Sequence, residues 1–318
     1  MNGAATGGGR SKPRLAAASC ARFPDLHDDW PLLRTALADV GVDAVTAVWN
    51  DPGVDWAGFD LVLASGAWDN IHHVDEFLAW AEGVAAAGVP VLNPPTMLRW
   101  NIDKHYLRDL ERAGVPTVPT VWVEPERGAA DLPSLTMPEG EVVVKPSVSG
   151  GGYRTARYEP HEHEAARAHV HELLSAGRTA MLQPYEPRVD AEGETALVYV
   201  GGIFSHAVHK DPMIRRGIGP TDSLMDNQVV TGATATDAQL VVAGQALAVA
   251  EGLLGPTTYA RVDMVERMGV GPALLELELL DPVLFFVHHP TGAATFARVL
   301  SDRLGWTSRR GLVPPRRG

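Results

Sequence analysis

Apolar and polar positions along the first third of the chain predict short strands separated by helices. Four short apolar runs have the length of buried strands, and they lie at residues 15–19, 44–49, 61–64 and 89–92. Two longer stretches between them repeat apolar residues at helical spacing, at residues 30–40 and 74–87. Strands that alternate with helices are typical of a parallel sheet covered by helices. We therefore predict an N-terminal parallel α/β domain over residues 15–93. Asn93, Pro94 and Pro95 mark the boundary at its end.

The pattern changes in the rest of the chain. Residues 94–186 combine a lysine-bearing helix, a glycine-rich loop and a helix at 161–176. Residues 187–306 contain mostly strands with the alternation of antiparallel sheets, plus helices at 237–252 and 290–304. The glycine-rich residues 1–14 are expected to form a disordered leader, and residues 307–318 a flexible tail. The expected fold class is α/β (α+β), with one parallel α/β domain and two α+β subdomains.

Charged residues interrupt two of the late apolar strands. The run from Tyr259 to Asp263 alternates with a period of two, so Arg261 and Asp263 share a face. Glu276 and Glu278 share a face of the next strand for the same reason. Burying such charges without partners is costly, and carboxylate oxygens suit Mg2+ bound together with phosphates. The pattern therefore favours a phosphate-handling metal site, with a structural salt bridge from Arg261 across the hairpin as the alternative.

A glycine-rich loop follows a buried strand in the middle of the chain. Residues 142–144 are all valine, Lys145 comes next, and residues 147–152 are serines, glycines and one valine. Glycines allow backbone N–H groups to approach an anion closely, and such groups bind phosphate. The lysine precedes the glycines, so the segment does not fit the GxxxxGK[ST] pattern. A phosphate-binding loop is the functional interpretation, and a plain hairpin turn is the structural one.

Two further segments carry polar groups in unusual places. Apolar residues at 102, 106, 107 and 110 predict a helix with Asn101 as its N-cap. Lys104 in its first turn is unfavourable for the helix dipole, so the lysine either serves a ligand or is simply solvated. The apolar strand from Met181 runs into a bend bracketed by Pro184 and Pro187, and Glu194 leads the strand that follows. This bend is either a ligand-contacting hinge or an ordinary connector.

The order of these features resembles the ATP-grasp superfamily of carboxylate–amine ligases, over roughly residues 15–305. Within it, the chain looks closest to the glutathione synthetase/RimK-like branch. Several short segments are similar to the actinobacterial group that includes the O-ureido-serine cyclo-ligase of cycloserine biosynthesis. They are Trp68-Asp69, Asn93-Pro94-Pro95, Arg99-Trp100-Asn101, residues 205–210 and Leu284-Phe285-Phe286.

The resemblance implies an ATP-grasp fold, whose two α+β subdomains clasp ATP. It implies ATP contacts at Lys104, Lys145, Ser147, Ser149, Gly150, Gly151, Gly152, Gln183, Pro184, Tyr185, Glu194 and Lys210. In this family pattern the lysines contact phosphates, the glycine loop folds over them, the backbone at residues 183–185 contacts the adenine and Glu194 bonds the ribose. Mg2+, or alternatively Mn2+, would be held by Asp263, Glu276 and Glu278. Most members end this motif as Glu-x-Asn, so Glu278 adds one negative charge.

The implied activity is ligation of a carboxylate to a nitrogen nucleophile through an acyl phosphate, with release of ADP and phosphate. Arg261, Lys210 and Lys145 would stabilise the transferring phosphoryl group, and Arg261 would also bind the substrate carboxylate. A kinase of the same fold and a non-catalytic nucleotide sensor are the alternatives. The loop at 211–227 carries Arg215 and Arg216, which either bind an acidic substrate group or form an exposed basic pair. The segment before Trp68 lacks an arginine expected in close relatives, so amide ligation and ring closure both stay open.

Composition adds limits on partners. The chain has 318 residues, 45% hydrophobic and 21% charged, as in ordinary globular proteins. A formal net charge of -12 argues against nucleic acid or anionic membrane as a partner. A single cysteine fits a reducing compartment, and no apolar run approaches the roughly 20 residues of a membrane span. We expect a cytoplasmic enzyme with small-molecule substrates, for which a homodimer is possible.

Overall fold

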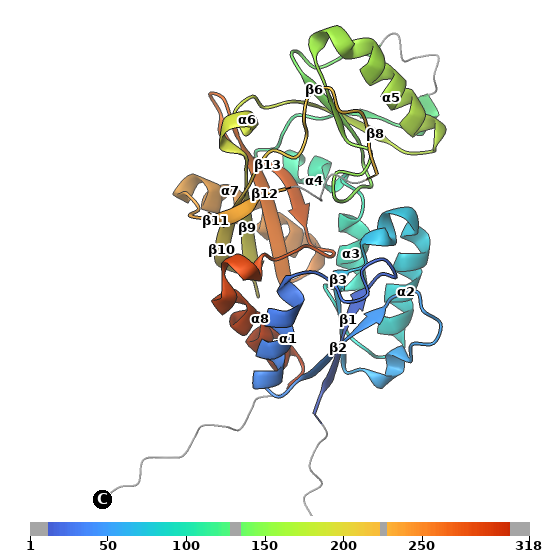
Figure 1. The fold of residues 1–318 in the computed structure, drawn as a ribbon, viewed down its shortest axis with the longest axis vertical. Helices are drawn as coiled ribbons and strands as arrows, with labels where there is room; N and C mark the ends of the chain where they lie inside the picture. Colours follow the sequence, from blue (N-terminus) through green and yellow to red (C-terminus); the bar gives the residue numbers. More distant parts are fainter. Residues whose placement is uncertain (1–11, 128–134, 223–227, 306–318) are drawn as a thin grey trace, which may run out of the picture.

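The computed structural model describes residues 12–127, 135–222 and 228–305, and these form three sheets that follow one another along the molecule (Figure 1). The first sheet has the order β2-β1-β3-β4, and its strands are parallel. Its strands are β1 (Arg14–Ser19), β2 (Asp43–Val48), β3 (Leu61–Gly66) and β4 (Val91–Leu92). The predicted parallel α/β layer is confirmed. The expected leader and tail lie mostly outside the described residues, and β1 begins at Arg14, inside the expected leader.

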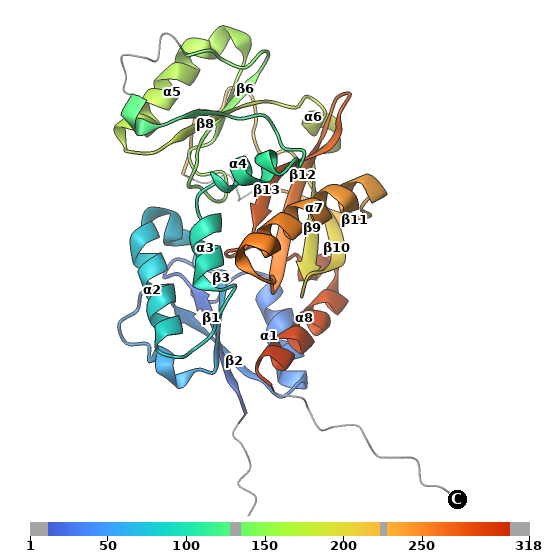
Figure 2. The same ribbon diagram turned by 180° about the vertical axis from the view of Figure 1, so that it is seen from behind.

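Helices cover both faces of the parallel sheet because both faces of its strands are apolar. Ala16 and Ala18 pack with α2 (Val74–Ala86), whereas Leu15 and Ala17 pack with α1 (Asp29–Asp39). The last helix, α8 (Pro290–Arg303), lies against α1 and joins the same core. Helix α8 therefore returns to the N-terminal domain, as Figure 2 shows from behind. This return brings the segment after the last strand against β3 and α1.

The second sheet is antiparallel with the order β11-β10-β9-β12-β13. Its strands are β9 (Glu194–Val200), β10 (Ile203–Lys210), β11 (Val230–Ala233), β12 (Tyr259–Arg267) and β13 (Gly271–Glu278). One face packs on α7 (Asp237–Leu254), through side chains such as Val262 and Leu277. Within the described residues, α7 alone is long and apolar enough to cross a membrane, and a buried core helix passes the same test. Its packing on the sheet accounts for its apolar character.

The third sheet has the order β5-β8-β6-β7 and is also antiparallel. Its strands are β5 (Val121–Val123), β6 (Val142–Pro146), β7 (Ala156–Tyr158) and β8 (Ala180–Pro184). Helix α5 (His163–Ser175) covers one face, and the short α6 (Val189–Glu192) follows β8. The 3-10 turns are Trp56–Gly58, Trp68–His72, Pro125–Arg127, Pro160–Glu162 and Phe286–His288. The glycine-rich segment joins β6 to β7.

The helix predicted with Asn101 as its N-cap is confirmed only over its second half, where Tyr106, Leu107 and Leu110 are buried, and its predicted start is wrong. Two short helices, α3 (Pro95–Asn101) and α4 (Tyr106–Arg112), replace it, and Lys104 lies in the turn between them. Asn101 does not cap a helix. Its buried side chain donates to Leu277 O at 2.7 Å and accepts from Leu279 N at 2.7 Å, at the end of β13. A buried amide needs both a donor and an acceptor, and the end of a strand supplied both.

Candidate active site

The charged residues of β12 and β13 lie opposite each other on one face of the second sheet. Arg261 pairs in register with Glu278, and Asp263 with Glu276. The intervening Val262 and Leu277 point to the α7 side, so the charged side chains occupy the face away from α7. Arg261 is 7% exposed and Asp263 is 2% exposed. The predicted shared face is therefore confirmed; Arg261 and Asp263 are buried there, whereas Glu276 and Glu278 are half-buried.

Two cations hold Asp263 from both sides. Lys210 Nζ lies 2.7 Å from Asp263 Oδ2 and 2.9 Å from Glu194 Oε2. Arg261 Nε lies 2.9 Å from Asp263 Oδ1, and its Nη2 contacts Glu278. The structural salt bridge considered from the sequence is thus present together with the carboxylate cluster. Lys210 and Glu194 come from the adjacent strands β10 and β9. The pairing of the strands therefore brings these charged side chains together with Asp263.

The carboxylates of this cluster differ in how well they are neutralised. Burial opposes ionisation of Asp263, but Arg261 and Lys210 outweigh it and lower its pKa to about 2. Burial raises the pKa of Glu278 to about 8, because Glu276 and Asp263 repel its charge and Arg261 only partly compensates. A further cation would relieve this repulsion. The donor set of three carboxylates fits a divalent ion such as Mg2+.

Lys104 connects the cluster to the glycine-rich loop. Its Nζ lies 3.0 Å from Glu276 Oε1 and donates to Ser149 O at 2.7 Å and Ser149 Oγ at 3.1 Å. Its backbone N–H donates to Ser147 O at 3.0 Å. The side chain is buried, so the solvated alternative for Lys104 is wrong. The turn between α3 and α4 thus positions a lysine between loop and carboxylates.

Lys145 differs from the other two lysines. It is 8% exposed, and within residues 12–127, 135–222 and 228–305 its ammonium forms no hydrogen bond or ion pair. Burial lowers its pKa to about 8, with Glu276 opposing this shift and Lys104 and Lys210 reinforcing it. A buried ammonium beside two other cations is costly unless an anion joins it. Of the three lysines, Lys145 is thus the one whose charge is left unpaired, whereas Lys104 and Lys210 already pair with carboxylates.

The glycine-rich loop is held in place by both neighbouring domains. Gly151 and Gly152 have φ angles of 57° and 74°, which other residues rarely adopt. The ring of Tyr153 lies 4.9 Å from that of His72 in the N-terminal domain. Arg154 N donates to Thr221 O at 2.7 Å, in the segment after β10. The loop thus adjoins all three parts of the molecule.

The predicted hinge lies at the end of β8. Gln183 and Pro184 pair with Val143 and Val142, and Gln183 Nε2 donates to Thr120 Oγ1 at 2.9 Å. The N–H of Tyr185 donates to Glu141 O at 2.8 Å. Pro184 has no N–H, and that of Tyr185 is already bonded. Any backbone donor to a ligand edge at this bend must therefore come from another position.

A buried ion network next to the hinge was not found from the sequence. Arg157 donates to both carboxylate oxygens of Asp190, at 2.7 and 2.9 Å, and also contacts Glu141. Its guanidinium lies 3.3 Å from the ring centroid of Tyr185. Arg216 donates to Glu141 Oε1 at 3.0 and 2.7 Å, so its guanidinium is already paired. No local motif marks these partners, which lie far apart in the sequence.

The N-terminal domain contacts the segment that follows β13. Trp68 Nε1 donates to Asp281 O at 3.2 Å, and Asn70 Nδ2 donates to Asp281 Oδ2 at 2.9 Å. Burial raises the pKa of Asp281 to about 7, with Arg261 opposing and Asp69 reinforcing the shift. The ring of His289 stacks on His206 at 4.7 Å, which supports a structural role for His289. The segments at Trp68 and at residues 284–286, which were noted in the sequence as similar to the cycloserine group, therefore lie near Arg261.

Elsewhere in the described residues, one group of possible metal ligands lies on the surface at the start of α5. It consists of Glu159, His161 and Glu162. Glu159 and Glu162 already form a capping box there. This group is separate from the buried cluster of carboxylates on the second sheet.

Three sheets, three buried lysines, a glycine-rich loop and a carboxylate cluster on adjacent strands are the features of an ATP-dependent ligase of the ATP-grasp fold. Residues 15–93 match the family model of the N-terminal domain of D-cycloserine synthetase DcsG. The cycloserine biosynthesis protein DcsG of Streptomyces lavendulae is 35% identical over 286 residues, which cover 87% of this chain and 94% of that protein. The chain therefore belongs to the DcsG family of ATP-grasp ligases.

Solved structures agree with this assignment. The crystal structure of D-cycloserine synthetase DcsG superimposes with a TM-score of 0.84 at 35% identity, covering 92% of this chain and 99% of that one. A RimK domain ATP-grasp protein from Sphaerobacter thermophilus shares the fold, with a TM-score of 0.61 at 22% identity and coverage of 90% and 98%. The resemblance found in the sequence is thus confirmed at the level of family and fold.

Proposed function

We propose that this ligase uses Mg-ATP to convert a substrate carboxylate into an acyl phosphate and then joins the acyl group to a nitrogen nucleophile. ADP leaves in the first step and phosphate in the second. The observation that supports this most strongly is that three buried lysines from three parts of the chain, Lys104, Lys145 and Lys210, gather around the carboxylates of β12 and β13. Cations for phosphates and ligands for a divalent ion are both needed in phosphoryl transfer.

Each charged group has a role in the first step. Asp263, Glu276 and Glu278 would hold Mg2+, which when bound neutralises phosphate charge. Lys145 and Lys104 bind phosphate oxygens, and Lys210 binds the γ-phosphate. Arg261 holds the substrate carboxylate beside it. A carboxylate oxygen bonds to the γ-phosphorus as the bond from that phosphorus to ADP breaks.

The second step needs positioning rather than a protein nucleophile. The nitrogen attacks the acyl carbon, loses a proton, and the carbon–oxygen bond to phosphate breaks. The glycine-rich loop, already in contact with Lys104 and His72, excludes water that would hydrolyse the acyl phosphate. Gln183, Pro184 and Tyr185 border the adenine, and Glu194 binds the ribose. The DcsG matches support a small amino-acid-derived substrate in natural-product biosynthesis, and a cytoplasmic enzyme is proposed with it.

The proposal is tested by incubating the enzyme with Mg-ATP and single carboxylic acids, with hydroxylamine as the trapping nucleophile. A hydroxamate formed together with ADP and phosphate is the expected result. ADP formed without phosphate or hydroxamate would show transfer to a hydroxyl and contradict ligation.

The matched variant is Glu276→Gln, which keeps the shape of the side chain but removes one metal-binding charge. We expect hydroxamate formation to fall by about 100-fold or more, because charge stabilisation of the transferring group is lost. The exposed Asp75→Asn serves as the control and should leave the rate unchanged. Full activity of Glu276→Gln would contradict the assignment of Glu276 as a ligand of Mg2+.

A further inference from the structure

The proposed reaction leaves the acceptor of one proton unassigned. An alkyl amine is protonated at neutral pH, so it has to lose a proton before its lone pair can attack the acyl carbon. A carboxylate or a neutral imidazole near Arg261 can accept that proton. The carboxylates of the second sheet already serve the metal in the proposed function or pair with Lys210. The acceptor must therefore lie on another side of Arg261.

The loop that follows β13 brings one more carboxylate to this place. Tyr259 and Arg261 share one face of β12, and each of them holds the loop. Tyr259 Oη donates to Leu280 O at 2.6 Å, and Arg261 Nη1 donates to Val283 O at 2.9 Å. Asp281 lies between these two points of attachment. Its carboxyl therefore lies close enough to the Arg261 guanidinium for that charge to influence its pKa.

The N-terminal domain fixes the orientation of Asp281. Trp68 Nε1 donates to Asp281 O at 3.2 Å, and Asn70 Nδ2 donates to Asp281 Oδ2 at 2.9 Å. Asn70 is buried, so its amide is held in place rather than solvated. Among the residues that the structure describes, no other side chain donates a hydrogen bond to Asp281 Oδ1. One oxygen of this half-buried carboxyl is thus held, and the other is left to accept a proton.

The surroundings of Asp281 suit a group that gains and loses a proton near neutral pH. Burial raises the pKa of the Asp281 carboxyl to about 7, with Arg261 of β12 opposing this shift and Asp69 of the Trp68–His72 turn reinforcing it. A base is most effective when its pKa lies near the pH at which the enzyme works. Asp281 therefore combines a free oxygen, a fixed orientation and a place beside Arg261.

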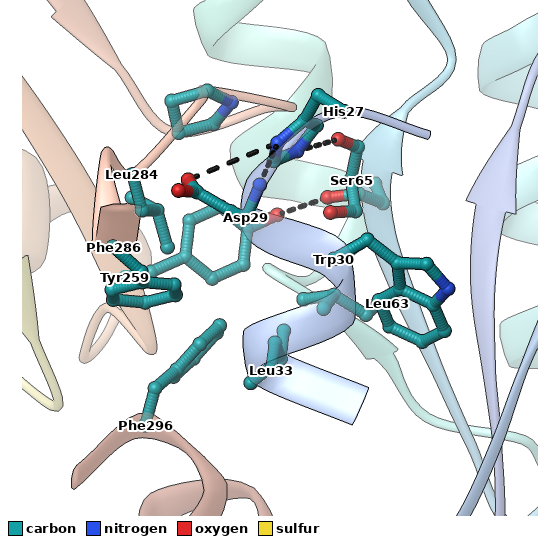
Figure 3. Close-up of a pocket in the computed structure, with 12 residues that line it drawn as sticks. His27, Asp29, Trp30, Leu33, Leu63, Ser65, Tyr259, Leu284, Phe286 and Phe296 are labelled. Atoms are coloured by element: carbon teal, nitrogen blue, oxygen red, sulfur yellow. Dashed lines mark hydrogen bonds and ion pairs between the residues drawn. The ribbon is translucent and has the colours of Figure 1, made fainter. Parts of the chain in front are cut away.

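His27 is the alternative acceptor on this side of Arg261. Burial, and to a lesser extent Arg261, lowers the pKa of His27, so the ring is neutral. However, His27 Nε2 lies 3.2 Å from Ser65 O, and its Nδ1 accepts from Asp29 N at 3.4 Å. Figure 3 shows the ring directed at these partners, at one end of a pocket with a mostly apolar lining. Neither ring nitrogen has a free lone pair for a proton.

We propose that Asp281 accepts a proton from the nitrogen nucleophile and so frees the lone pair that attacks the acyl phosphate at Arg261. A protonated amine loses two protons on its way to an amide. The first passes to Asp281 Oδ1, and the nitrogen–carbon bond then forms. The second passes to phosphate as the carbon–oxygen bond breaks with its electron pair, and Asp281 returns its proton to solvent when the product leaves.

This assignment rests on the proposed function, because it takes an acyl phosphate beside Arg261 as given. It makes Asp281 a catalytic residue, since its carboxyl touches the nucleophile. Asn70 and Trp68 are then positioning residues, which act only through the orientation of Asp281.

The test compares two nucleophiles on the carboxylic acid that yields hydroxamate with the wild type. Methylamine is protonated at neutral pH and needs the base, whereas hydroxylamine is mostly neutral there and does not. Asp281→Asn keeps an oxygen for the hydrogen bond from Asn70 but cannot accept the proton. Above pH 7 we expect methylamide formation to fall by about 100-fold, and hydroxamate formation to stay within about threefold of the wild type.

The pH dependence separates a base from a structural brace. Below pH 7 the wild-type Asp281 is protonated, so the ratio of wild-type to Asp281→Asn methylamide rates should fall toward one. Protonation of methylamine itself cancels in this ratio. Asp69→Asn should shift the fall to lower pH, because Asp69 raises the pKa of Asp281. The substituted side chain still offers an oxygen to Trp49 Nε1, which donates to Asp69 Oδ1 at 2.6 Å.

A second variant tests the same assignment if Asp281→Asn does not fold. Asn70→Ala removes the donor that orients the carboxyl and keeps the carboxyl itself. Methylamide formation should fall by about 10-fold, and hydroxamate formation should again be spared.

Several results would overturn the assignment. Equal loss of methylamide and hydroxamate would make Asp281 only a brace for the loop after β13. Retention of both products, no methylamide from the wild type, or a ratio that does not change with pH would place the base elsewhere. Failure of the wild type to form hydroxamate from any acid would instead contradict the proposed ligation, and the assignment of Asp281 with it, so the two failures are distinguishable.

Discussion

The two ends of the candidate ATP site are both rich in buried charge, yet they differ in how completely that charge is paired. At the hinge, Arg157 is held by Asp190, Glu141 and the ring of Tyr185. At the other end, Lys145 has no partner among the described residues, and the pKa of Glu278 is raised to about 8 by burial and neighbouring carboxylates. Charges that are fully paired are satisfied within the fold. A buried charge without a partner is satisfied only when a ligand of opposite charge binds. We infer from this difference that the charges at the hinge are structural and that those around Lys145 serve a ligand.

Lys145→Met should have the largest effect, in opposite directions on activity and stability. Activity should fall by about 100-fold or more, because a cation facing the phosphates is lost. The ligand-free protein should become more stable at pH 7, because burial lowers the pKa of Lys145 from 10.5 to about 8. Between those values the unfolded chain binds more protons, so the wild type gains stability as pH rises.

The stabilisation by Lys145→Met should therefore be largest below pH 8, at roughly 1 to 3 kcal/mol, and shrink toward pH 10.5. Urea unfolding at several pH values measures it, and the exposed Lys12→Met is the control. Destabilisation by Lys145→Met at pH 7 would show that this lysine is as well paired as Arg157.

Arg157→Met should have an intermediate effect, mainly on stability. It leaves Glu141 and Asp190 without their buried partner, so the free energy of unfolding should fall by roughly 2 kcal/mol. The loss is not larger because Asp190 is partly exposed to solvent. The midpoint of urea unfolding should decrease, and Arg157→Lys, which keeps the charge without the forked geometry, should lie between. A loss of turnover without a loss of stability would place Arg157 in the functional group instead.

Arg216→Gln should have the smallest effect. Arg216 is about half exposed, and its bonds to Glu141 bridge the segment after β10 to the third sheet. Exposed ion pairs contribute little and are screened by salt. We expect a small decrease in the unfolding midpoint at low salt that disappears at high salt. A decrease that persists at high salt would mean that this bridge is part of the buried network.

Much of the candidate site could be predicted from short patterns in the chain. Alternation along β12 and β13 was enough to put Arg261, Asp263, Glu276 and Glu278 on shared faces, because a strand's side chains alternate whatever it packs against. Lys145 at the end of an all-valine strand, followed by glycines, was recognisable for the same local reason. The parallel order of the first domain followed from its alternation of strands and helices.

The sequence by itself determined these local periodicities, and with them the family. Only the tertiary structure decided which distant groups meet. Asn101 bonds the end of β13, Arg157 meets Asp190, and Asp29 bonds Val287, which is 258 residues away. Such contacts depend on the path of the whole chain, above all on the return of α8 to α1, and no pattern of neighbouring residues encodes that path.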